Sequence, residues 1–116
     1  MSVEQTCVQA IMQRRDYTEI IPELEQFWDL PDGYFYRLRQ GDYDPRGAAA
    51  VEELLNSIEV SEASQLPRRL VSLTWFIPTF MEWQIERVGK AGGDTSALQR
   101  DIDRLLNAVE RLLGVP

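Results

Sequence analysis

Hydrophobic positions along this chain follow helical periodicity almost throughout. The segment 95–113 is the clearest example, because its apolar residues recur at intervals of three and four positions. The residues of this apolar stripe are Leu98, Ile102, Leu105, Leu106, Val109, Leu112 and Leu113. Such spacing keeps apolar side chains on one face of a helix and leaves charged residues on the other. We predict a long amphipathic helix that ends at Gly114. Ser96, followed by Gln99, resembles a capping box at its start, with Thr95 and Asp94 as competing caps.

The most apolar stretch runs from Leu70 to Ile85. It is predicted to lie within one central helix, buried on most sides, that starts near Pro67 and ends before the Gly92–Gly93 pair. Pro78 should kink this helix, because proline removes a backbone donor and crowds the preceding turn. Its apolar part, Leu70–Ile85, is sixteen residues long and includes Glu82. A membrane span needs about 20 mostly apolar residues. No membrane-spanning segment is therefore predicted.

Three shorter helices are predicted nearer the N-terminus. Segments 3–15 and 18–28 carry apolar residues at helical spacing, and the second helix is expected to begin near Thr18 or Pro22. Segment 34–40 is predicted to be a short helix closed by Gly41, although its three consecutive aromatic residues also tolerate a strand.

A further helix is predicted over residues 44–59. Asp44 suits the N-cap and Pro45 suits the first helical position, because proline has no N–H to leave unsatisfied there. The predicted fold class is all-α. The expected architecture is a compact single-domain bundle over residues 1–116, with four main helices plus one or two short ones.

Composition removes most catalytic and metal chemistry. The chain has no histidine and one cysteine, which excludes the usual zinc sites, disulfide frameworks, Cys-His dyads and Ser-His-Asp triads. Cys7 lies at an apolar position of a predicted helix and is interpreted as a small core residue. We predict no cofactor, no metal and no catalytic residue. The enzymatic alternative is a hydrolase built from carboxylates, with or without Mg²⁺.

Net charge points away from nucleic acid. The chain carries a formal charge of −7 and an estimated pI of 4.5, and its arginines are scattered rather than gathered into one run. No nucleic-acid binding is predicted. No basic N-terminal stretch leads into an apolar run, so no signal peptide is predicted and a cytoplasmic location is expected.

Acidic residues concentrate in two stretches. Segment 16–32 sums to −6 and segment 48–66 to −4, and neither contains a basic residue. Beside the first lies a group of aromatic residues, namely Phe27, Trp28, Tyr34, Phe35, Tyr36 and Tyr43. One interpretation is that the acids are solvated helix faces above an aromatic core. The other is that acids and aromatics together form a binding surface, because Tyr, Trp and Arg anchor protein interfaces.

The leading hypothesis is a small acidic protein, without enzymatic activity, that neutralises or regulates a basic protein partner by occlusion. In size, charge and helix content the chain is similar to bacterial immunity proteins and antitoxins, and that resemblance implies a toxin or nuclease as the partner. Charge complementarity would speed association with such a partner. The predicted partner-binding residues are Asp29, Asp32, Tyr34, Tyr36, Asp42, Tyr43 and Asp44.

The alternative hypothesis is a self-associating helical subunit or adaptor that forms a homodimer through its helices. The location of exposed apolar surface separates the two hypotheses. Exposure along the last helix, 95–113, would favour self-association, whereas exposure around 34–43 would favour a foreign partner.

Overall fold

Seven helices and no strand make up the part of the chain that the computed structural model describes, residues 17–59 and 65–116. The helices are α2 (Tyr17–Asp29), α3 (Tyr34–Arg39), α4 (Pro45–Asn56), α5 (Arg68–Thr74), α6 (Ile77–Trp83), α7 (Ile85–Lys90) and α8 (Thr95–Leu113). The predicted all-α class is confirmed. The predicted helix over 3–15 lies outside the described residues.

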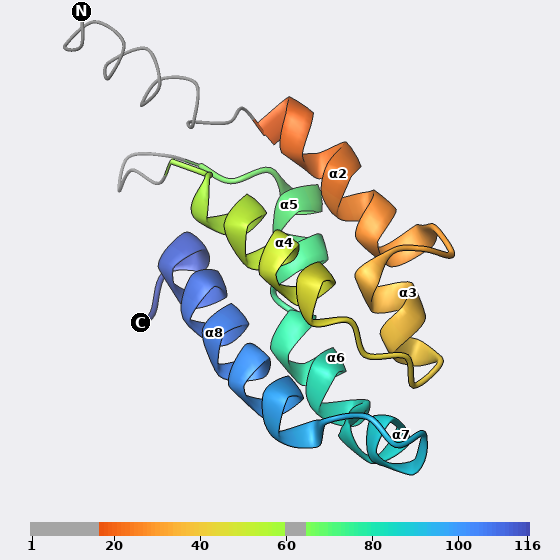
Figure 1. Cartoon of the computed structure of the whole chain (residues 1–116). Helices are drawn as coiled ribbons and strands as arrows, with labels where there is room; N and C mark the ends of the chain where they lie inside the picture. The colour runs from red at the N-terminus through yellow and green to blue at the C-terminus, as the bar shows by residue number, and fades with distance from the viewer. Residues whose placement is uncertain (1–16, 60–64) are drawn as a thin grey trace, which may run out of the picture.

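Two groups of helices pack around one apolar core. The long helix α8 runs beside α4 and also packs on α6, whereas α2 packs on α3 and α5 (Figure 1). Every one of the seven described helices contributes at least one buried apolar residue to the same cluster. The described residues therefore form a compact helical bundle.

The predicted helix at the C-terminal end of the sequence is confirmed as α8. Its N-cap is Asp94, whose side chain accepts a hydrogen bond from the Ala97 N–H at 3.0 Å. Most of its apolar stripe is buried, but Leu106 remains 39% exposed and Leu113 is half-buried. Because α4 and α6 cover the stripe, the last helix presents little apolar surface to a second molecule.

Helix α4 begins as predicted and is closed at its other end by a side chain from α8. Asp44 is its N-cap and accepts a hydrogen bond from the Arg46 N–H at 3.1 Å. Arg111 of α8 donates to the backbone carbonyls of Leu55 and Ile58 at 2.8 and 3.3 Å. A cation at this end satisfies carbonyls that lack an intrahelical partner. The contact joins the two helices that pack side by side.

The predicted single central helix is wrong, because three short helices replace it. Pro78 does not kink a continuous helix but occupies the second position of α6, where a missing N–H costs nothing. A second break follows at Gln84, whose N–H bonds back to the Met81 carbonyl at 3.0 Å. The breaks leave Trp75 and Trp83 56% and 67% exposed, although the sequence pattern predicts a segment buried on most sides.

Segment 34–39 is helical rather than extended. Tyr34, Phe35 and Leu38 are all buried, which matches the spacing of one helix face. Gly33 precedes the helix, and a Cβ atom there would lie 2.4 Å from the Gln26 carbonyl oxygen. The close approach of the α2 backbone therefore requires glycine at this turn.

Candidate functional site

The seven predicted partner-binding residues lie at the end of α2, in the turn after it, on α3 and on the loop before α4, but they do not form one exposed surface. Asp29, Asp32 and Asp42 are exposed. Half-buried positions are Tyr36, Tyr43 and Asp44, and the buried residue is Tyr34. Their burial and hydrogen bonds show which of them stabilise the fold and which remain accessible to a partner.

Tyr34 is a core residue. It is 1% exposed, and its ring packs so closely on α4 that a Cβ at Gly47 would lie 2.7 Å from Tyr34 Cδ1. Its hydroxyl has no hydrogen-bond partner among the described residues, and burial raises the pKa of Tyr34 far above its ordinary value. The structure therefore removes Tyr34 from the predicted contact surface, because a partner cannot reach a side chain at this depth.

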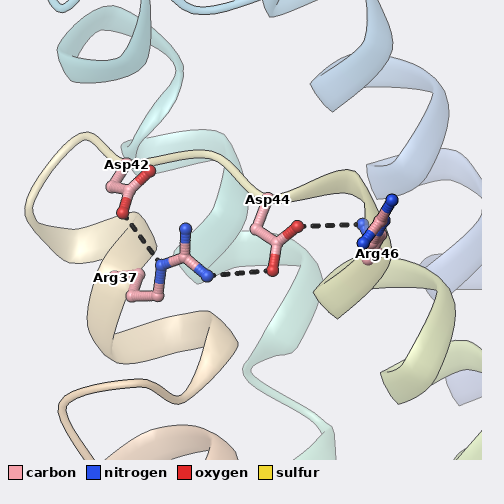
Figure 2. A network of polar contacts seen from close by, with 4 residues as sticks. All are labelled: Arg37, Asp42, Asp44 and Arg46. Carbon is pink, nitrogen blue, oxygen red and sulfur yellow. Dashed lines mark hydrogen bonds and ion pairs between the residues drawn. The ribbon is translucent and has the colours of Figure 1, made fainter.

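Asp42 and Asp44 are already engaged within the chain. Figure 2 shows the Arg37 guanidinium between them, with Nε donating to Asp42 at 2.8 Å and Nη1 donating to Asp44 at 3.0 Å. The other Asp44 oxygen caps α4 through the Arg46 N–H. The hydrogen bond that Arg37 donates to Asp42 is the main reason that the pKa of Arg37 is raised. An incoming cation would have to compete with Arg37 for both carboxylates.

Tyr43 ties the same loop to the opposite group of helices. Its hydroxyl donates to the carboxylate of Asp101 on α8. Burial, followed by this hydrogen bond, raises the pKa of Tyr43 above its ordinary value. Tyr43 and Asp44 thus hold the α3–α4 loop in place, and the ring of Tyr43 is only half available to a partner.

The remaining predicted residues form what we call the acidic edge, defined as Asp29, Asp32 and Tyr36. Asp29 ends α2, Asp32 lies in the turn and Tyr36 lies on α3. Neither aspartate forms an ion pair with any part of the chain that the structure describes. By contrast, Glu25 on α2 pairs with Arg69 of α5 at 2.8 Å. The acidic edge is therefore the part of the predicted site whose charges stay unmatched.

A second surface was not predicted from the sequence. We call Trp75, Phe76 and Trp83 the aromatic surface. The ring centroids of Phe76 lie 5.3 Å from Trp75 and 5.2 Å from Trp83. A depression beside Trp83 is lined by Trp83, Glu86, Arg87 and Lys90.

A sequence signal for this surface existed. At steps of three and four residues, the polar positions Ser72, Thr79, Glu82 and Glu86 trace one stripe through the central segment. Trp75 falls on that stripe and Trp83 lies beside Glu82. Helical spacing therefore places both indoles on the polar side of this segment, even though the segment as a whole is rich in apolar residues.

Comparisons with known proteins do not assign the chain to a family. No protein-family model matches it, and neither curated proteins nor solved structures yield a match. Among the described residues, no group of three or more His, Cys, Asp or Glu side chains is placed to hold a metal ion. Within the same residues, each helix is too short or too polar to cross a membrane.

Proposed function

We propose that this chain is a small acidic binding protein that occludes a basic partner protein and carries out no chemistry itself. The observation that carries the proposal is the acidic edge. Asp29 and Asp32 are exposed carboxylates without a cationic partner among the described residues. They lie at the end of segment 17–32, which contains no basic residue, and unlike Glu25, which pairs with Arg69, they have no ionic partner in the described part of the chain. Unmatched charge of one sign steers an oppositely charged partner toward the surface.

The contact set of this proposal is smaller than the sequence predicts. The contact set is centred on Asp29, Asp32 and Tyr36. Asp42 contributes less, because its ion pair with Arg37 partly neutralises its charge. Tyr43 and Asp44 support the neighbouring loop. Tyrosine suits the central position because it offers a large contact area at a low cost in conformational entropy.

The partner class follows from the charge. A toxin or nuclease exposes Lys and Arg for its own anionic substrate, and the acidic edge would cover those groups. This role matches that of bacterial immunity proteins and antitoxins, and it places the protein in the cytoplasm, where a toxin would otherwise act. The proposal requires no cofactor and no metal.

The test is affinity capture from native lysate with three baits, followed by association kinetics with the captured partner. The baits are the natural chain, an Asp29→Lys/Asp32→Lys variant and an Asp103→Lys/Glu110→Lys control. Each double reversal adds four charges, so both variants move from −7 to −3. The control residues are exposed positions on α8.

The proposal expects a basic protein on the natural chain and on the control, and its loss from the acidic-edge variant. The association rate should fall by at least about tenfold, because steering acts before contact. Equal capture by the two variants would remove the acidic edge from the interface. Absence of any basic protein from the natural bait would overturn the neutralising role.

A further inference from the structure

The aromatic surface is the outer end of a continuous aromatic cluster. Trp28 stacks on buried Phe35 with 4.2 Å between centroids and contacts Phe80 at 4.9 Å. Phe80 in turn lies 6.3 Å from Phe76, which contacts the two exposed indoles. The Trp28 Nε1–H also donates to the Leu73 carbonyl at 3.1 Å. The indoles of Trp75 and Trp83 therefore project from a rigid base, which suits a preorganised contact surface.

Charges of both signs border the exposed indoles. Glu82 directly precedes Trp83, and it forms no ion pair within the described residues. Arg87 meets the backbone carbonyl of Arg39, and Arg39 lies 5.5 Å over the ring of Phe80. Neither arginine pairs with a carboxylate among the residues described. Glu82 lies on α6 and Arg87 on α7, and Arg87 lines the depression beside Trp83. One anion and two cations near the aromatic residues therefore lack an ionic partner among the described residues.

We infer that the aromatic surface binds a second copy of this chain in a two-fold symmetric dimer. In such an interface the same patch occurs on both subunits, so each contact is made twice. The indoles of Trp75 and Trp83 meet those of the second copy. Glu82 of each subunit then faces Arg87 of the other, so two of the three unmatched charges gain a partner.

The available area fits a dimer of modest affinity. Two indoles exposed at 56% and 67% present on the order of 300 Å² per chain, since a tryptophan side chain offers about 250 Å². A standard interface buries about 800 Å² per partner. The indoles would supply more than a third of that area, and they are the residue type that dominates interface energetics.

The charges near the indoles suit a second copy. It carries the same anion and the same cations, so a two-fold arrangement can place Glu82 of one subunit opposite Arg87 of the other. The inference does not depend on the proposed function, because the two surfaces share no residue.

The test is sedimentation velocity on the full chain between about 1 µM and about 1 mM, the range in which small interfaces dissociate. The mass should rise with concentration from 13.4 kDa toward twice that value. Trp75→Ala and Trp83→Ala should each weaken dimerisation by at least about tenfold. Leu106→Ala is the matched control, because it truncates an exposed apolar side chain on α8 and should leave the dimer intact.

A charge exchange tests the symmetric pairing. Glu82→Arg and Arg87→Glu should each weaken the dimer, and the double variant should recover most of the loss. Circular dichroism on each variant confirms that the fold is retained. A monomer at every concentration overturns the inference, as does a dimer that only Leu106→Ala disrupts. If that monomer shows blue-shifted tryptophan fluorescence with phosphatidylglycerol vesicles, the aromatic surface belongs to a membrane instead.

Discussion

Tyr34 carries a buried hydroxyl that makes no hydrogen bond with the described residues, and such a group lowers the stability of a small core. An unsatisfied buried polar group costs about 1–3 kcal/mol of folding free energy. Its ring is nonetheless well packed, because it contacts Phe35 with 5.1 Å between centroids and approaches Gly47 closely. At this scale, burial decides whether a side chain serves the core or a partner.

The variant Tyr34→Phe tests this description. Removing the hydroxyl keeps the packing and deletes the unsatisfied group, so the free energy of unfolding should stay equal or rise by about 1 kcal/mol. Urea denaturation of the two proteins measures the difference. A loss of more than about 1 kcal/mol would mean that the hydroxyl is hydrogen-bonded. Partner binding should not change, because the ring is inaccessible.

Two tyrosines also predict how stability depends on pH. Folding raises the pKa of Tyr34 and of Tyr43 above the ordinary value of 10.0. The unfolded chain therefore releases these protons before the folded chain does, and the stability they contribute is complete below pH 10 and declines as pH rises further. Unfolding free energies at successive pH values above 10 should fall for the natural chain. The Tyr34→Phe/Tyr43→Phe variant should show a shallower decline, and identical slopes would contradict the shifts.

At the scale of helices, local chemistry sets where each element begins and tertiary contacts set its neighbours. Asp44 and Asp94 cap α4 and α8, as short polar residues before a helical run predict. The central segment departs from its pattern because α6 starts anew at Ile77. Helical periodicity alone does not distinguish one helix kinked at Pro78 from a new helix that begins just before it, because proline is compatible with either arrangement.

Paired alanine variants measure the two roles of the carboxylates around Arg37. Asp44→Ala removes both the cap of α4 and one bond to Arg37, and it should lower the free energy of unfolding by about 1–2 kcal/mol. Asp42→Ala removes only an exposed ion pair and should cost less than about 1 kcal/mol. Thermal or urea unfolding distinguishes them. Equal losses would show that the cap is not the dominant interaction.

For the whole molecule, net charge separates the two proposed surfaces. Salt screens interactions between exposed charges, so added salt should weaken binding of a basic partner at the acidic edge. Added salt should change the affinity of the dimer less than the affinity for a basic partner, because it screens both the Glu82–Arg87 pairs and the repulsion between two chains of net charge −7, whereas the indole contacts are apolar. Both affinities can be followed over the same salt series by biosensor and sedimentation. A dimer that weakens with salt as steeply as partner binding would contradict an interface dominated by apolar contact.

The candidate site was only partly predictable. The sequence places Asp29, Asp32 and Tyr36 near a turn, and the structure leaves the two aspartates exposed and the tyrosine half-buried. The sequence does not reveal that Arg37 forms ion pairs with Asp42 and Asp44. Nor does it reveal that Tyr43 donates a hydrogen bond to Asp101, fifty-eight positions later in the chain. Pairing between distant side chains depends on how helices pack, and a one-dimensional pattern does not encode that.

The sequence by itself determined the helical class, the cap of α4 and most of the buried stripe of α8, whereas the structure selected Asp94 among three candidate caps of α8. The features that the sequence determined arise from interactions within a few residues, so spacing and residue type are sufficient to predict them. Tertiary structure decided that Tyr34 is buried and that no neighbouring helix among the described residues covers Trp75 and Trp83, although helical spacing already places the two indoles on the polar side of their segment. The reason is geometric: an aromatic residue is apolar in any sequence, but only the packing of neighbouring helices settles whether its ring is covered.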